Sequence, residues 1–148
     1  MNRISVIIPV LNEAKTIGGL LDYLVQNSND TLISEILVVD GGSTDGSQKI
    51  VSELSKTHPK IIGLNSPKGR AKQMNFGASQ SKGSVLYFLH ADSIPPKNFD
   101  QYILEAIDTG IKTGCFKMKF DSSHWWLQLA GWFTQFNWQS CRGGDQSL

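Results

Sequence analysis

A run of four apolar residues that ends abruptly in a polar, glycine-rich turn is the feature that most constrains this chain. Residues 36–39 carry no polar alternation, which is typical of a strand covered on both faces, as in parallel sheets with helical crossovers. Asp40, Gly41 and Gly42 follow, and a Ser-Thr-Asp cluster leads into a helical pattern. Because open α/β sheets bind ligands at the carboxyl ends of such strands, this turn is the first candidate site.

The residues of this turn have special backbone and capping properties. Gly41 and Gly42 allow backbone torsions closed to other residues and let a ligand approach the main chain. Asp45, three residues before Gln48, predicts a capping box at the start of the next helix. From these residues alone, two interpretations stay open: a ligand-binding turn, or a strand-to-helix connection that is only well capped.

Strand and helix patterns alternate along the first two thirds of the chain. Apolar runs predict strands over residues 4–8, 36–39, 61–64 and 85–89, the first of them ended by Pro9. Apolar residues at helical spacing predict helices over residues 14–26, 48–57, 69–80 and 99–107. In the third helix we expect one packed side made of Ala71, Met74, Asn75 and Ala78. The alternation predicts an α/β fold, a Rossmann-like, mostly parallel sheet with helices on both faces.

The pattern changes towards the C-terminus. Residues 114–120 alternate, with Phe116, Met118 and Phe120 on one side, which predicts an antiparallel strand at the sheet edge. Aromatic residues then recur at helical spacing between Trp125 and Trp138. This segment fits a core helix, the favoured interpretation, or a helix in peripheral contact with a membrane.

Composition and charge exclude several classes of protein. The 148 residues, 40% of them hydrophobic, suffice for one domain with a sizeable core. A net charge of +1 without a run of Lys or Arg gives no basis for binding nucleic acid. Cys115 and Cys141 form no disulfide framework, and no apolar run is typical of a signal peptide or a spanning helix, so we expect a cytoplasmic protein.

Familiar phosphate-binding motifs do not occur in this sequence. The glycines after the central strand do not satisfy GxGxxG, and no GxxxxGK[ST] is present, which disfavours dinucleotide dehydrogenases and P-loop enzymes. Polar residues stand instead at successive strand ends, namely Asn12, Glu13, Asp40, Arg70, His90 and Asp92. Groups that converge on one sheet edge in this way indicate a site for a polyanion bound through a metal.

Five segments, in their order and spacing, resemble the family 2 glycosyltransferases of the GT-A fold: IPVLNE, VVDGGSTDGS, GRAKQMNFGA, FLHADSIPP and GGDQ. Within that family the chain is similar to bacterial members with an HAD triplet, here His90, Ala91 and Asp92, in place of Asp-x-Asp. The resemblance implies a single GT-A domain over residues 1–148. It also implies metal-assisted, inverting transfer of a sugar from a nucleoside-diphosphate sugar to an acceptor hydroxyl.

The resemblance implies roles at the diphosphate. Asp92 matches the last acid of the metal motif and is the first choice as a ligand of Mg²⁺ or Mn²⁺. His90 is the second choice, and bracing Asp92 is its favoured role. Arg70 matches a position that approaches the diphosphate, which a guanidinium can grip. The plainer alternatives are a turn-forming Asp92 and an exposed Arg70 at a helix start.

The resemblance also implies the nucleoside contacts. Pro9, Asn12 and Glu13 match the family's first loop, and Asp40 matches the first acid of its Asp-Asp-Gly-Ser motif. Gly41, followed by Gly42, stands where relatives have the acid that reads the base, so no base is preferred. Asp40 could contact the nucleoside or could only cap the next helix.

The acceptor side is the least defined. Asp145 in GGDQ matches a recurring motif and is the one candidate catalytic residue, because the family's usual general base lies in a downstream acidic pair that these residues lack. We therefore expect a domain incomplete at its C-terminus that binds donor, transfers sugar very slowly or not at all, and could self-associate as a homo-oligomer. The sequence does not identify the acceptor, for which a lipid and a saccharide are the two candidates. The alternatives are a nucleotidyltransferase, which would need a Gly-rich loop after the first strand, and a silent sugar-nucleotide-binding module.

Overall fold

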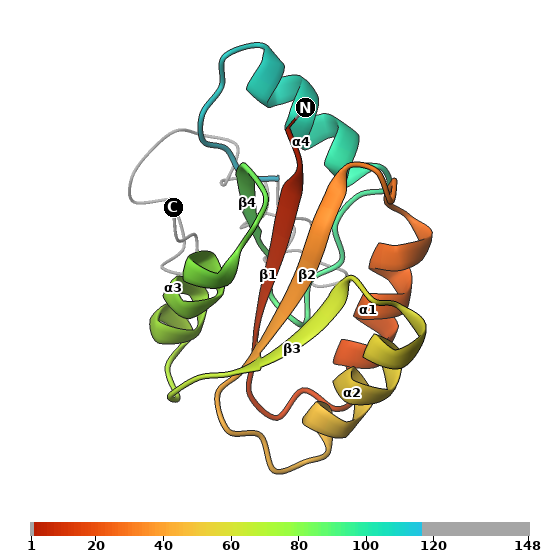
Figure 1. Ribbon diagram of the computed structural model, residues 1–148, viewed down its shortest axis with the longest axis vertical. Coiled ribbons are helices and arrows are strands. Elements are labelled where there is room, and N and C mark those ends of the chain that lie inside the picture. The colour runs from red at the N-terminus through yellow and green to blue at the C-terminus, as the bar shows by residue number, and fades with distance from the viewer. Residues whose placement is uncertain (1, 117–148) are drawn as a thin grey trace, which may run out of the picture. The chain divides into compact units, whose positions relative to one another are not determined.

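The computed structural model describes residues 2–116, and its elements alternate along the chain (Figure 1). Residues up to Glu105 form one compact unit, and a second unit begins at Ala106. In chain order the elements are β1 (Ile4–Val10), α1 (Ile17–Gln26), β2 (Ile33–Asp40), α2 (Ser47–Thr57), β3 (Ile61–Asn65), α3 (Arg70–Gln80), β4 (Val85–Phe88) and α4 (Phe99–Asp108).

The four strands of the described part form one sheet in the order β3-β2-β1-β4, and all of its pairs are parallel. The central strands β1 and β2 are almost entirely buried, as their apolar runs predict. Val10 pairs with Asp40, and Asp40 pairs with Asn65, so three strands end at the same level. Residues that follow these strands therefore begin at one edge of the sheet.

Helices cover both faces of the sheet (Figure 1). On one face α3 packs against β1 and β2, over a cluster formed by Ile7, Leu37 and Val39. On the other face α1 lies beside α2, and α2 lies over β3, where Val51 approaches Gly63. This arrangement follows from right-handed crossovers, because the chain runs outward from β1 to β3 and then returns to β4 on the far side of β1.

Several predicted boundaries were wrong, among them the start of β2, which lies at Ile33 rather than at residue 36. The first strand does not end at Pro9 but continues to Val10. The Ile7 carbonyl accepts a hydrogen bond from the chain after β4, and the backbone nitrogen of Pro9, two residues later, points to the same side. The pairing of β1 with β4 has already ended at that level, so the missing N–H of Pro9 removes no hydrogen bond from the sheet. Helix α1 begins at Ile17 rather than at residue 14, and the residues before it form a single turn in which the Ile17 N–H donates to the Glu13 carbonyl at 2.9 Å.

The predicted packed side of the third helix was right at two of its four positions, since Met74 is buried and Ala78 packs against the core cluster. Ala71 and Asn75 are exposed, whereas Gln73, Met74 and Gly77 face the sheet. A pattern of apolar residues cannot detect this side, since its members include a polar residue and a glycine. The predicted antiparallel strand is not seen in residues 114–116, and the rest of it, the aromatic segment and Asp145 lie outside the described residues.

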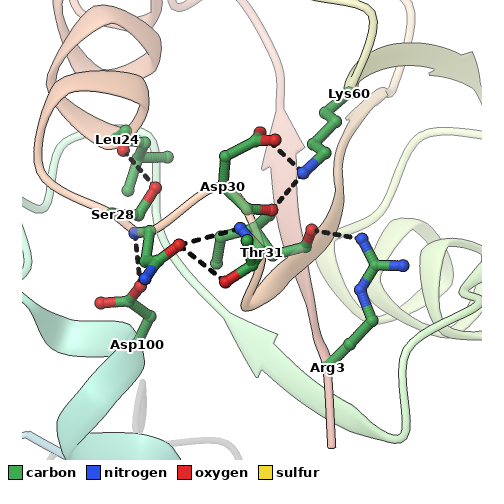
Figure 2. A network of polar contacts seen from close by, with 9 residues as sticks. Arg3, Leu24, Ser28, Asp30, Thr31, Lys60 and Asp100 are labelled. Atoms are coloured by element: carbon green, nitrogen blue, oxygen red, sulfur yellow. Dashed lines mark hydrogen bonds and ion pairs between the residues drawn. The ribbon is translucent and has the colours of Figure 1, made fainter. Parts of the chain in front are cut away.

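The amino-terminal edge of the sheet is occupied by structural contacts (Figure 2). Lys60 forms an ion pair with Asp30 at 2.6 Å, and the Arg3 guanidinium donates to the Ile33 carbonyl at 3.1 Å. The buried Asp100 of α4 accepts a hydrogen bond of 2.6 Å from the Asn29 N–H. These contacts tie the loop before β2 to its neighbours.

The close approach of α3 to the sheet makes Gly77 a sensitive position. A Cβ at Gly77 would lie 2.6 Å from Ile7 Cγ2 and 3.0 Å from Val39 Cγ2. We expect Gly77→Ala to lower the free energy of unfolding by about 1–3 kcal/mol in urea denaturation, because overpacking outweighs the gain in helix propensity.

Gly19→Ala is the matched control, since Gly19 is exposed in α1 and nothing lies within 4 Å of its added Cβ. The free energy of unfolding of this variant should rise by about 0.5–1 kcal/mol, because alanine has the higher helix propensity. Equal responses of the two variants would contradict the tight contact between α3 and the sheet.

Candidate functional site

The carboxyl edge of the sheet brings together the polar residues predicted there. Asp40 is the last residue of β2, Asn12 follows β1 by two residues, and Arg70 is the first residue of α3. His90 follows β4 after Leu89, whose N–H donates to the Ile7 carbonyl at 3.0 Å. The parallel sheet therefore places these elements at one edge, as the sequence predicts.

Asp40 holds the turn that follows β2. Its side chain is buried, and its Oδ1 accepts hydrogen bonds from the N–H groups of Gly42 (2.7 Å) and Ser43 (2.8 Å) and from Gln48 Nε2 (2.7 Å). Burial alone would raise the pKa of Asp40, but the hydrogen bonds from Ser43, Gln48 and Gly42 outweigh it and lower the pKa. The carboxylate is therefore charged at neutral pH.

The two oxygens of the Asp40 carboxylate have different surroundings. Oδ2 is buried and has no hydrogen-bond partner among the described residues. Asp40 also borders a groove of about 450 Å³ between α2 and β3, with Gln48, Val51 and Asn65 among its lining residues. A buried, charged acceptor without a donor is costly unless a donor reaches it, so this end of β2 suits an N–H or O–H group of a bound molecule.

The loops after β1 and β2 are joined by reciprocal hydrogen bonds. The Asn12 N–H donates to Ser43 Oγ (2.8 Å), and the Thr44 N–H donates to Asn12 Oδ1 (2.9 Å). The Glu13 N–H donates to Ser47 Oγ (2.9 Å). Asn12 has a positive φ of 59°, a conformation that Asn adopts more readily than most residues. The two predicted nucleoside loops thus form one connected surface.

The predicted capping box is not formed. Asp45 accepts hydrogen bonds from the hydroxyl (2.6 Å) and N–H (3.0 Å) of Ser47 and from the Ala14 N–H (2.8 Å), and these lower its pKa. Gln48 turns instead to Asp40. The residue before α2 is Gly46, with a positive φ of 98° and no side-chain cap. The prediction was wrong because Gln48 reaches the strand end rather than the helix end.

Glycine is required at positions 41 and 42 of the turn for two different physical reasons. Gly42 has a positive φ of 98°, which confirms the predicted need for glycine. Gly41 has no positive φ, but a Cβ there would lie 2.9 Å from Gln73 Oε1. Gln73, which is 3% exposed, is a site residue that the sequence analysis missed. The available signal was a glutamine three residues after Arg70 and four residues before Gly77, on one side of the predicted helix.

The segment after β4 forms a turn that presents Asp92. The Ser93 N–H donates to the His90 carbonyl (3.1 Å), and the Ser93 hydroxyl donates to Asp92 Oδ1 (3.3 Å). Asp92 is exposed, whereas Ala91 is buried and His90 is half-buried. Within residues 2–116, no three His, Cys, Asp or Glu side chains lie close enough to hold a metal ion by themselves.

The first turn of α3 is an exposed cationic helix start. Arg70 is exposed, and Gly69 before it has a positive φ of 138° and provides no side-chain cap. Uncapped N–H groups at a helix start favour anions, and a guanidinium adds a charged donor. This end of α3 can therefore interact with phosphate groups.

The lowered pKa of Asp40 predicts a pH-dependent contribution to stability. Because the folded state holds the carboxylate below its ordinary pKa of 3.8, the contribution is present above that value and is lost as the pH falls through the folded pKa. We expect Asp40→Asn to lower the free energy of unfolding by about 1–3 kcal/mol near pH 7, since hydrogen bonds to a charged acceptor become weaker.

Urea unfolding from about pH 7 to about pH 3 measures the difference in the free energy of unfolding between the wild type and Asp40→Asn. This difference should become smaller at the acidic end. Asp22→Asn is the control, because it removes a carboxylate from an exposed position of α1 and should change stability by less than ~0.5 kcal/mol. A difference between the two proteins that stays constant with pH would contradict the lowered pKa of Asp40.

Solved structures of two other proteins share the fold of this chain. Mannosyltransferase PcManGT from Pyrobaculum calidifontis, in complex with GDP-Man and Mn²⁺, matches with a TM-score of 0.58 and 28% identity, over 68% of this chain and 30% of that one. S. aureus TarS 1-349 in complex with UDP matches with a TM-score of 0.61 and 29% identity, over 72% and 32%. These neighbours are GT-A glycosyltransferases, which confirms the predicted fold class.

Curated relatives are similar over most of this chain. Glycosyltransferase AglE of Haloferax volcanii is 34% identical over 113 residues, which are 75% of this chain and 36% of AglE. The dolichol-phosphate mannosyltransferase of Pyrococcus furiosus is 32% identical over 109 residues, which are 73% of this chain and 31% of that protein. The chain spans about a third of the length of these relatives.

A family model covers the chain more completely than any of these relatives. The model of glycosyl transferase family 2 matches residues 5–142, a range that includes both joined loops, the start of α3 and the turn that presents Asp92. On this match, the chain belongs to glycosyl transferase family 2.

Proposed function

We propose that this domain binds a nucleoside-diphosphate sugar at the carboxyl edge of its sheet and takes part in transferring the sugar to an acceptor hydroxyl, with inversion. The observation that carries the proposal is the arrangement of this edge. A buried acceptor in Asp40, a cationic helix start at Arg70 and an exposed carboxylate in Asp92 follow strands that end on the same side of one parallel sheet.

A divalent metal fits the residues present. Mg²⁺ and Mn²⁺ take oxygen ligands, and Mg²⁺ commonly binds through one or two carboxylates while substrate phosphates and water complete its coordination. A single exposed carboxylate, Asp92, therefore suffices for the protein's share, with His90 as a second candidate. When bound, the metal would neutralise charge on the diphosphate leaving group. PcManGT with GDP-Man and Mn²⁺ supports this proposal.

The other residues would orient the donor. Arg70 and the N–H groups at the start of α3 would bind phosphate oxygens. Pro9, Asn12 and Glu13 belong to or follow β1, next to the turn held by Asp40, and would lie along the nucleoside. The free oxygen of Asp40 would accept a hydrogen bond from the base or ribose. Asp145, outside the described residues, is the candidate proton acceptor.

The names of several relatives support a lipid-linked acceptor. They include dolichol-phosphate mannosyltransferase from Pyrococcus furiosus and undecaprenyl-phosphate 4-deoxy-4-formamido-L-arabinose transferase from Proteus mirabilis. A saccharide acceptor is the alternative. In the part of the chain that the structure describes, no helix is long and apolar enough to cross a membrane.

The proposed metal role predicts that donor binding depends on Asp92. Calorimetry with UDP and GDP should detect binding with Mn²⁺ or Mg²⁺ and little binding after chelation. Asp92→Ala should abolish the metal-dependent part, because the domain then has no carboxylate at this turn. Asp22→Ala in α1 is the matched control and should bind like the wild type. Equal, metal-independent binding by wild type and Asp92→Ala would exclude this role.

The end of β2 predicts weak discrimination between bases. Gly41 offers no side chain, and Asp40 has one free acceptor oxygen, which any base can meet with an N–H group. We expect dissociation constants for UDP, GDP, TDP and CDP within ~10-fold of one another, that is, within about 1.4 kcal/mol. A preference above ~100-fold that Asp40→Asn abolishes would instead make Asp40 a selective base reader.

A further inference from the structure

Gln73 is a buried polar residue to which the proposed transfer gives no role. It lies on the inner side of α3, beside Met74 and Gly77, and only 3% of its surface is exposed. Buried amides are retained where their hydrogen bonds are satisfied, and an unsatisfied one is costly. Its partners therefore indicate what it does.

The amide of Gln73 joins the ends of two strands to α3. Nε2 donates to the Val10 carbonyl at 2.8 Å and to the Val39 carbonyl at 2.7 Å. Because both hydrogens of the amide are used, its orientation is determined: a flipped amide would place Oε1 against two carbonyl oxygens. Val10 also accepts the Gly41 N–H at 2.9 Å, so one amide connects β1, β2 and the first residue of the turn.

The fixed amide explains why position 41 is a glycine. A Cβ at Gly41 would lie 2.9 Å from Gln73 Oε1 and 3.0 Å from Gln73 Cδ. The backbone there has no positive φ, and the three atoms nearest to this Cβ all belong to the Gln73 amide, so the amide is the first obstacle to a side chain at position 41. Gly41 and Gln73 thus form a matched pair: the amide of Gln73, from α3, fills the space that a side chain at position 41 would need.

The same amide sets the position of the first turn of α3. Arg70 precedes Gln73 by three residues, which is less than one helical turn. One turn beyond Gln73, Gly77 lets α3 approach the sheet closely. The helix is therefore held near its start by hydrogen bonds to the strand ends, and the distance between Arg70 and the turn after Asp40 depends on them.

We propose that Gln73 is a positioning residue for the donor: it holds the first turn of α3, and with it Arg70, against the turn that follows β2. This inference rests on the proposed function, because it requires that Arg70 bind the diphosphate. Gln73 itself touches no reacting group. It acts by keeping two parts of the site, which come from distant parts of the chain, at the spacing that a nucleoside diphosphate spans.

Gln73→Met tests the proposal, because it keeps the size of the side chain and removes both donors. The dissociation constants of UDP and GDP with Mn²⁺ should rise ~10-fold, equivalent to about 1.4 kcal/mol. In an Arg70→Ala background the same change should have no further effect, since the group it positions is gone. Gln80→Met, at the exposed end of the same helix, is the matched control and should leave binding unchanged.

A purely structural role would give a different result. Gln73→Met would then lower the unfolding temperature but leave the dissociation constants of the folded protein unchanged, or would weaken binding equally with and without Arg70. Either result overturns the inference while the proposed function stands. Failure of the wild type to bind UDP or GDP with Mn²⁺ or Mg²⁺ would instead reject the proposed function and, with it, the donor role of Gln73.

The pairing of Gly41 with Gln73 can be measured without any ligand. Gly41→Ala should lower the unfolding temperature by several degrees, and so should Gln73→Ala. The unfolding temperature of the double variant should fall by less than the sum of the two single decreases, because removing the amide makes room for the alanine. Strict additivity would overturn the matched pair and the fixed orientation on which the inference depends.

Discussion

The parallel pairing of β1 with β2 is the constraint on which the site depends. Val10 lies opposite Asp40, and the Val10 carbonyl accepts the Gly41 N–H at 2.9 Å, so the two strands end together. A shift of one residue would turn every side chain of a strand to the opposite face, and both faces of these strands are buried. The register that builds the core therefore also decides which residues stand at the carboxyl edge of the sheet.

A second requirement is the hydrogen bonding of a buried charge. Asp40 is at the end of a buried strand, where an ionised carboxylate is stable only if donors surround it. The N–H groups of Gly42 and Ser43 and the amide of Gln48 supply them to one oxygen. The second oxygen receives none among the described residues, so the carboxylate organises the turn through one oxygen alone.

Close packing of α3 extends this organisation to the other side of the sheet. Helices α1 and α2 cover one face and α3 covers the other, so the joined loops after β1 and β2 and the start of α3 approach the edge from opposite faces. Gly77 allows the contact, and the amide of Gln73 fixes it. The start of α3 is thereby attached to the ends of β1 and β2, close to the turn that Asp40 organises.

The sequence by itself determined the alternation of strands and helices, the α/β class and the polar residues after each strand, because these follow from local periodicity and turn chemistry. It also indicated the family through five ordered segments. Only the tertiary structure decided which of the polar residues cooperate. Gln73 and Val10 are 63 positions apart, and Ala14 and Asp45 are 31 apart, so no local pattern could pair them. The reason for Gly41 is likewise a contact with another element, and contacts of this kind exist only once helices have packed on the sheet.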